Sequence, residues 1–134
     1  MADVPEVLFM CTHNAGRSQM AAALLAQEGG GAVRVTSAGS EPASQVNPAV
    51  AAAMAEIGVD ISREIPKQLA DGQAEAADIV ISMGCGDACP VFPGKRYLTW
   101  ELPDPAGLSV EQVRPIRDDI AARVRALLKE LDIS

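Results

Sequence analysis

The stretch FMCTHNAGRSQM, Phe9–Met20, places a cysteine and an arginine in a short loop between an apolar run and a helical one. Before the loop, Val4–Met10 is apolar apart from Pro5 and Glu6, which predicts a buried parallel strand. After it, Gly16–Gln27 is rich in Ala, Leu and Gln, residues that favour a helix. A strand, a turn and a helix in this order are typical of the opening unit of a parallel α/β sheet.

The rest of the chain continues this alternation. The final helix is expected to begin at Ser109, which forms a capping-box pattern with Gln112, and Pro115 predicts a kink or a restart within it. Strands alternating with helices predict an α/β domain over residues 1–134, with a parallel sheet covered on both sides. Further strands are expected at Val33–Thr36, Ala77–Met83 and Lys95–Leu98, and further helices from Asn47 to the stop at Gly58 and over Pro66–Leu69.

The composition limits what the chain can bind. Of its 134 residues, 49% are hydrophobic and 22% are charged, which fits one globular domain. The net charge of -7 disfavours nucleic acid and anionic membranes as partners, so an anionic ligand needs a local positive site. The stretch MADVPEV has no basic start or apolar core, and no apolar run approaches the ~18 residues of a membrane span, so we expect a cytoplasmic protein. Three cysteines, an odd number, favour reactive thiols over a disulfide framework.

The loop has the features of an anion-binding site that also holds a nucleophile. In parallel sheets, ligands bind where strand carboxyl ends meet helix N-termini, and a loop of small residues can point its backbone N–H groups inward. Arg17 adds a planar fork that matches two oxygens of a tetrahedral anion, with Cys11 at the floor. The same N–H groups and the Ser18 hydroxyl should stabilise a Cys11 thiolate. A cysteine and an arginine six residues apart are more often structural, but the flanking strand and helix favour the functional interpretation.

The loop C-T-H-N-A-G-R-S, Cys11–Ser18, resembles the C-x5-R-[ST] phosphate-binding loop of the low-molecular-weight protein tyrosine phosphatase superfamily, which also follows the first strand. Within this superfamily, the chain is most similar to the arsenate reductases over nearly its whole length. The resemblance implies a four-stranded parallel sheet flanked by helices on both faces. Further motifs that carry it lie at Arg17–Ala21, Thr36–Gly39, Asn47–Pro48, Gly58–Ser62 and Asp104–Gly107.

The resemblance also implies roles for individual residues. Cys11 is then the nucleophile, Ser18 supports its thiolate, and Asp104 is the general acid that protonates the departing oxygen. The chemistry requires such an acid because oxide is a poor leaving group without a proton. Without the family, Asp104 before Pro105 is typical of an ordinary loop turn. The oxyanion is expected to bind to Arg17 and to the loop residues Thr12, His13, Asn14, Ala15 and Gly16.

The residues after Asp104 bear on the choice of substrate. A phosphatase of this family is expected to carry aromatic residues after its aspartate-proline pair, whereas Ala106 and Gly107 follow here. A small, bare site suits a free inorganic oxyanion, so we predict reduction of arsenate to arsenite through an arsenocysteine on Cys11, a detoxification reaction. The alternatives are a low-molecular-weight phosphatase that hydrolyses phosphate monoesters, and a non-enzymatic oxyanion or redox sensor.

A second thiol is available from Cys85 or Cys89, which follow the third predicted strand in the stretch MGCGDACP. Since parallel strands end at the same edge, both thiols are expected near Cys11, where one attacks the arsenic adduct and the other presents the disulfide to thioredoxin. The C-x3-C spacing is shorter than in thioredoxin-coupled relatives, and the stretch MGCGD, Met83–Asp87, also resembles enzymes that use mycothiol with a glutaredoxin-like mycoredoxin. In that alternative, Cys11 alone carries out the protein's part of the chemistry.

No metal or organic cofactor is expected. A zinc site at Cys85 and Cys89 would find only the chain's single histidine as a further ligand, short of the four that structural zinc usually takes. Some relatives hold potassium near the loop with a glutamate in the first helix, and the matching position here is Ala22, which disfavours such a site. Arg63 and Lys67 are expected on the solvated surface.

Overall fold

The computed structural model describes residues 4–39, 41–68, 72–83 and 96–131. Four parallel strands form one sheet in the order β2-β1-β3-β4, which confirms the predicted fold class. Because β1 lies between β2 and β3, the order reverses at β1, and ligands in such sheets bind outside the carboxyl ends of the strands at this switch point. The strands are β1 (Glu6–Cys11), β2 (Arg34–Gly39), β3 (Ile79–Ser82) and β4 (Arg96–Thr99).

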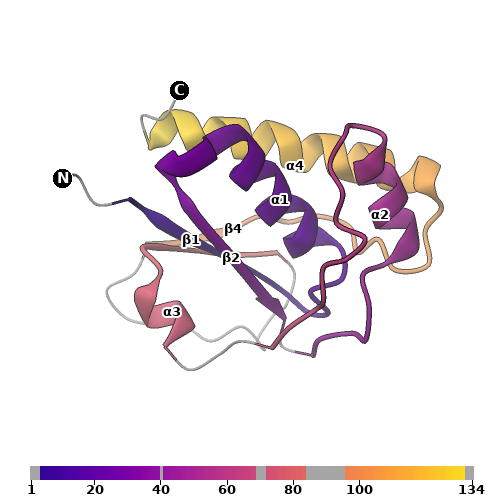
Figure 1. The fold of residues 1–134 in the computed structure, drawn as a ribbon, viewed down its shortest axis with the longest axis horizontal. Coiled ribbons are helices and arrows are strands. Elements are labelled where there is room, and N and C mark those ends of the chain that lie inside the picture. The colour runs from indigo at the N-terminus through magenta and orange to yellow at the C-terminus, as the bar shows by residue number, and fades with distance from the viewer. Residues whose placement is uncertain (1–3, 40, 69–71, 84–95, 132–134) are drawn as a thin grey trace.

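The helices cover the two faces of the sheet unequally (Figure 1). Three lie together over one face: α1 (Arg17–Gly29), α2 (Pro48–Ala55) and α4 (Val110–Glu130). The short helix α3 (Gln73–Ala76) lies on the other face, and a 3-10 turn, η1 (Gly30–Ala32), follows α1. The sequence did not predict α3 or η1. Among the helices of the described residues, none combines the length and the apolarity needed to cross a membrane.

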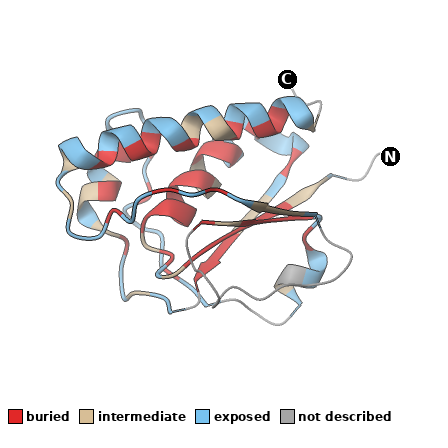
Figure 2. Cartoon of the chain, turned by 180° about the vertical axis from the view of Figure 1, so that it is seen from behind, coloured by how far each residue is buried: buried red, intermediate tan, exposed pale blue. Residues whose placement is uncertain are grey.

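Side chains of β1 alternate between two hydrophobic clusters, as expected for a strand that is buried on both faces. Val7 and Phe9 belong to the larger cluster, which includes residues of α1, α2 and α4. Leu8 and Met10 belong to the smaller cluster on the opposite face. Figure 2 shows the buried residues of the long helices turned toward the sheet. The strand that carries the predicted nucleophile is therefore held from both sides.

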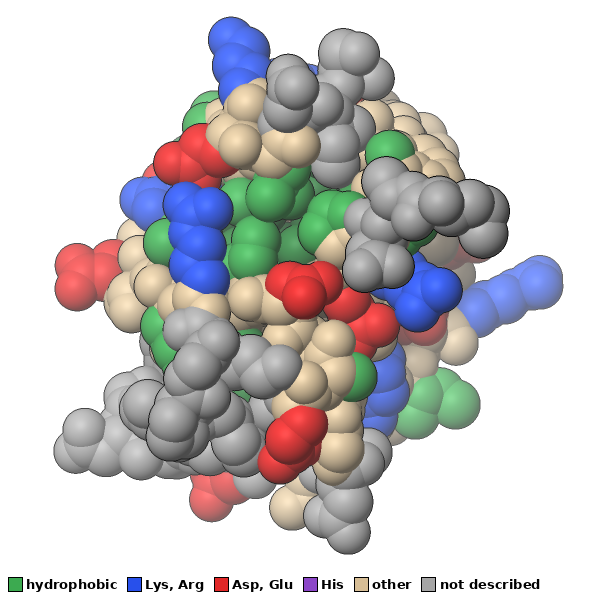
Figure 3. Space-filling view, turned by 90° about the vertical axis from the view of Figure 1, so that its left-hand side faces the viewer, with side chains coloured by type: hydrophobic (Ala, Val, Ile, Leu, Met, Phe, Trp, Pro, Cys, Tyr) green, Lys and Arg blue, Asp and Glu red, His purple; other side chains and the backbone are tan. Residues whose placement is uncertain are grey.

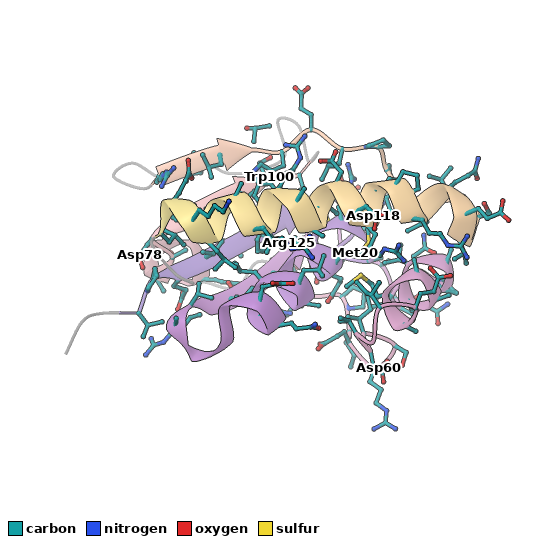
Figure 4. The ribbon with its side chains drawn as sticks, turned by 90° about the horizontal axis from the view of Figure 1, so that it is seen from above. Met20, Asp60, Asp78, Trp100, Asp118 and Arg125 are labelled. Carbon is teal, nitrogen blue, oxygen red and sulfur yellow. The ribbon has the colours of Figure 1, made fainter. Side chains whose placement is uncertain are left out.

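Helix α4 closes the larger core and begins where the sequence predicts. The Ser109 side chain accepts the Gln112 N–H, and the Gln112 side chain accepts the Ser109 N–H, which completes the capping box. The helix continues through Pro115, so the predicted restart is wrong; buried residues on both sides of this proline hold the helix to the core. Met20 and Trp100 are buried on the two sides of α4 (Figure 4).

The segment that follows α2 differs from the prediction. The sequence predicts a short helix over Pro66–Leu69, but the described part of this segment is irregular, and Gln68 forms an isolated parallel bridge with Gly39. The Lys67 N–H donates to Asn14 Oδ1 at 3.0 Å, and the Lys67 carbonyl accepts the Gly39 N–H at 2.9 Å. The predicted helix is wrong because these bonds to distant segments replace the bonds of a helical turn.

The amino ends of the strands form the end of the molecule that Figure 3 faces, opposite the edge where Cys11 stands. This end carries Lys or Arg and Asp or Glu side chains around a group of hydrophobic ones. The Glu6 N–H donates to Asp78 Oδ2 at 2.8 Å, and Arg96 forms an ion pair of 2.9 Å with Glu130. These contacts join β1 to the residue before β3, and β4 to α4, away from the predicted site.

Candidate active site

Cys11 is the last residue of β1 and therefore stands at the switch point of the sheet. It is 2% exposed; its Sγ lies 2.9 Å from Ser18 Oγ and accepts the Asn14 N–H at 3.3 Å. Because Ser18 is the second residue of α1, the first turn of that helix lies beside the sulfur. A hydroxyl, a backbone N–H and the first turn of a helix therefore meet at this sulfur.

Asn14 links the sulfur to the surrounding structure. It is fully buried and adopts a positive φ of 50°, which asparagine tolerates better than most residues. Its Nδ2 donates to Ser18 Oγ at 2.7 Å, which leaves the hydroxyl hydrogen of Ser18 for the sulfur of Cys11. Its Oδ1 accepts from Gln19 Nε2 at 3.1 Å and from the Lys67 N–H at 3.0 Å. The Cys11 sulfur is thus connected to α1 and to a segment far along the chain.

Three hydrogen bonds, which we call the carbonyl belt, fix the peptide groups of the loop. Loop carbonyls point outward and accept N–H groups of the 41–47 segment at 2.8–3.0 Å. Because a peptide group is planar and trans, an outward carbonyl turns the following N–H inward. The N–H of Asn14, which donates to the sulfur, has this inward orientation. The same planarity turns the N–H groups of His13 and Gly16 inward as well. The belt joins Thr12 to Glu41, His13 to Ala43 and Ala15 to Asn47.

A pocket of about 30 Å³ opens at Cys11, more than the roughly 10–15 Å³ that one water molecule needs. Arg17 is 6% exposed, and its Nη1 donates to the Leu102 carbonyl at 3.4 Å. Its Nη2 lies 3.8 Å from Oδ2 of Asp104, whose side chain is 49% exposed. The pocket thus offers a buried cation for binding an anion and an accessible carboxyl group for proton transfer. Its other lining residues are His13, Ala15 and Gly16 from the loop, and Asn47, Pro105 and Ala106 around it.

The structure brings most of the predicted site residues together. Cys11, Arg17 and Asp104 line one pocket with three of the loop residues, while Ser18 and Asn14 lie directly behind the sulfur. Thr12 does not line the pocket, and its carbonyl belongs to the belt. Cys85 and Cys89 lie outside the described residues. Within the described ranges, no group of three or more His, Cys, Asp or Glu residues is placed to hold a metal ion.

Three contributors were missed by sequence reasoning: Gln19, Asn47 and Lys67. Asn47 does cap α2 as predicted, since its Oδ1 accepts the Ala49 N–H at 2.9 Å, but it also lines the pocket. Lys67 is exposed as predicted, yet its backbone N–H holds Asn14. The positions of Gln19 and Asn47 within the family motifs were a usable signal. A backbone contact such as that of Lys67 leaves no signal in the residue type.

The comparison with protein families explains this arrangement. The model of the family described as low molecular weight phosphotyrosine protein phosphatase matches residues 6–134. The chain belongs to this family. Its resemblance to the phosphatase superfamily, stated above from the loop Cys11–Ser18 and the downstream motifs, is confirmed.

Members of the low-molecular-weight phosphatase family that are similar to this chain include enzymes named arsenate reductases. The glutaredoxin arsenate reductase of Synechocystis sp. is 36% identical over 129 residues, which cover 94% of this chain and 98% of that protein. A structure of the thioredoxin-dependent arsenate reductase of Corynebacterium glutamicum matches 98% of this chain with a TM-score of 0.84 and 48% identity; this chain spans 63% of that longer chain. An arsenate reductase in the phosphate-binding state matches 97% of this chain and 99% of its own, with a TM-score of 0.83 and 34% identity.

Proposed function

We propose that this protein is an arsenate reductase that forms an arsenocysteine on Cys11 and uses a thiol reductant. The observation that carries the proposal is the pocket in which the Cys11 sulfur, the Arg17 guanidinium and the Asp104 carboxyl group meet. The relatives named above support arsenate over a phosphate ester. The pocket supports it too, because alanine, glycine and proline line it where an aryl ester would need an aromatic clasp. We also propose a cytoplasmic location, since thiols persist in a reducing compartment.

In the first step, the Cys11 thiolate attacks arsenic of a bound arsenate. An S–As bond forms, the bond from arsenic to one of its hydroxyl groups breaks, and Asp104 supplies the one proton with which that hydroxyl leaves as water. Arg17 and the inward N–H groups of the loop bind the remaining oxygens and the charge that develops on them. Arsenic stays pentavalent in this step, because no electrons have yet passed from sulfur to arsenic.

In the second step, another thiolate attacks the sulfur of the adduct. An S–S bond forms, the electron pair of the S–As bond stays with arsenic, and arsenite leaves in the trivalent state. Two thiols have then lost two electrons to arsenic, so the resulting disulfide must be reduced by an external thiol before the next turnover. This balance requires a second thiol and a thiol co-substrate, but no metal or organic cofactor.

We propose that the second thiol is Cys85 or Cys89, acting as a relay to thioredoxin. The end of β3 supports this, because Ser82 pairs with Met10 and the Met83 N–H donates to the Met10 carbonyl at 2.7 Å. The chain therefore leaves β3 beside the residue that precedes Cys11, two residues before Cys85. The alternative is direct attack by a small thiol such as mycothiol, followed by a glutaredoxin-like protein.

The test is arsenite formation by the wild-type protein, supplied either with thioredoxin and its reductase or with a low-molecular-weight thiol and a glutaredoxin-like partner. We expect turnover with at least one system and none in the Cys11→Ser variant. The relay predicts that Cys85→Ser and Cys89→Ser stop turnover with thioredoxin while leaving phosphate binding intact. Turnover that survives in both variants would refute the relay. Hydrolysis of an aryl phosphate without any arsenite would make the protein a phosphatase, and arsenate binding without turnover would make it a sensor.

A further inference from the structure

We infer that Asn47 is a positioning residue that holds the loop around Asp104 against the loop Cys11–Ser18, called the anion loop below. Three hydrogen bonds meet at this residue. Its backbone N–H donates to the Ala15 carbonyl at 2.9 Å, which is the last bond of the carbonyl belt. Its Nδ2 donates to the Pro105 carbonyl at 3.2 Å, and its Oδ1 accepts the Ala49 N–H at 2.9 Å. One residue thus touches the anion loop, the residue after the proposed acid, and the start of α2.

Asp104 depends on such a support because its own carboxylate is weakly held. The side chain is 49% exposed, and its Oδ2 lies 3.8 Å from Arg17 Nη2, beyond hydrogen-bond distance. Its Oδ1 accepts the Ala106 N–H at 3.0 Å, a bond within its own loop. The position of the Asp104 carboxylate relative to Cys11 therefore depends on the position of the Pro105 backbone.

Gly16 limits the same loop from the opposite direction. A Cβ atom at Gly16 would lie 2.6 Å from Cγ of Pro105, so the proline ring already packs against the bare backbone of the anion loop. The hydrogen bond from the Asn47 amide holds the Pro105 carbonyl toward the anion loop. The contact between the proline ring and Gly16 limits how closely the two loops can approach each other. Together they fix where Asp104 stands relative to the sulfur.

Asparagine suits position 47 because the residue there both caps α2 and donates a hydrogen bond to the Pro105 carbonyl. Serine and aspartate cap helices about as well as asparagine, because each offers an oxygen to the first free N–H groups. Only asparagine among these also offers an N–H donor long enough to reach a second segment. The asparagine-proline pair that marks the start of α2 is thus also part of the pocket.

The inference rests on the proposed role of Asp104 as the acid, and Asn47→Ser tests it. Serine keeps the cap and the backbone bond, adds no charge to the pocket, and is too short to reach Pro105. We expect the rate at which arsenate consumes the Cys11 thiolate to fall about 10-fold, because small displacements of a catalytic group are costly. The affinity for inorganic phosphate should stay within about twofold, since the anion loop keeps its belt. The Asn47→Ala variant, which also removes the cap, should show the same kinetic loss together with a lower Tm.

A double-mutant cycle separates positioning from a merely structural role. In an Asp104→Asn background, Asn47→Ser should slow the reaction by less than about twofold, because the group that it positions is already gone. An equal loss in both backgrounds, a wild-type rate in Asn47→Ser, or a parallel loss of phosphate affinity would overturn the inference.

Hydrogen exchange decides the inference independently of catalysis. The peptide over residues 101–108 should exchange faster in Asn47→Ser than in the wild type, while the peptide over residues 17–29 should not change. Unchanged exchange over residues 101–108 would overturn the inference. If the wild-type protein forms no arsenite with any reductant, the proposed function fails, and this measurement alone decides whether Asn47 holds the loop.

Discussion

Arg17 is a buried cation whose donors are only partly used inside the chain. In the described part of the structure, Nη1 binds the Leu102 carbonyl, and Nη2 stays 3.8 Å from Asp104. A guanidinium has five N–H donors in a fixed plane, so several remain for the oxygens of a bound anion. An oxyanion that binds two of these donors at once forms a bidentate, charge-assisted pair, which is stronger than a single hydrogen bond.

Replacing Arg17 with lysine should therefore weaken anion binding although the charge is kept. An ammonium group cannot bind two oxygens in parallel, so we expect the affinity for inorganic phosphate to fall by about tenfold or more. Isothermal titration calorimetry with phosphate measures this directly. The exposed Arg63 provides the matched control, because Arg63→Lys should leave the affinity unchanged. Equal affinity in Arg17→Lys and wild type would show that charge alone binds the anion.

Between elements, the contact of α2 with α4 is held by one carboxylate and two arginines. Glu56, directly after α2, accepts from Arg114 Nε at 3.0 Å and from Arg117 Nη1 at 2.8 Å. Arg117 also donates to the Ala53 carbonyl at 2.8 Å, so it closes the end of α2 as well. The hydrogen bonds from Arg114, followed by those from Arg117, lower the pKa of Glu56 from 4.5 to about 2.

This lowered pKa makes the stability depend on pH in a defined window. In the unfolded chain Glu56 takes up a proton near pH 4.5, whereas in the folded protein it keeps its charge down to about pH 2. Its contribution is therefore complete above pH 4.5 and is lost as the pH falls toward 2. Glu56→Gln should have a lower Tm than the wild type at neutral pH, with a difference that shrinks across this window. Thermal unfolding at a series of pH values measures it; Glu101→Gln, at an exposed loop position, should show no such difference.

Among the individual strands, helices and loops, some could be predicted from the sequence and others could not. β1, the anion loop and α1 were predictable because neighbouring residues determine them: an apolar run, small residues, then helix formers. The capping box at Ser109 is equally local. The helix predicted over Pro66–Leu69 failed because Lys67 bonds to Asn14 and Gly39, and no local pattern encodes a partner so far away. The helix α3 spans only Gln73–Ala76, too short for a periodic signal.

In the whole molecule, the site forms where distant parts of the chain converge on one edge of the sheet. The anion loop is met by the end of β2, by the segment around Lys67, by Asn47 and by Pro105. At Gly39 the backbone of β2 lies directly against the backbone of the anion loop. A Cβ atom there would lie 2.7 Å from the Thr12 carbonyl oxygen and 2.9 Å from the Asn14 nitrogen, both backbone atoms.

Gly39→Ala should therefore damage both stability and activity. The added methyl group meets rigid backbone, so β2 and the anion loop must separate, at a cost of about 1–3 kcal/mol in the free energy of unfolding. We expect a lower midpoint in urea and weaker phosphate binding in the same variant. Gly31→Ala is the control, since a Cβ atom at Gly31 meets nothing within 4 Å. Equal midpoints in the two variants would contradict this account of the close approach.

The carbonyl belt has a consequence for how freely the exterior of the protein can vary. Glu41 and Ala43 donate to the belt through their main chains, and Glu41 is exposed, so the side chain at position 41 can vary widely without disturbing the receptor beneath. Proline is the exception, because it has no hydrogen on its nitrogen and would release one peptide plane of the loop. Surface variants of this enzyme can therefore be made at Glu41 for solubility or labelling, provided that the imino acid is avoided.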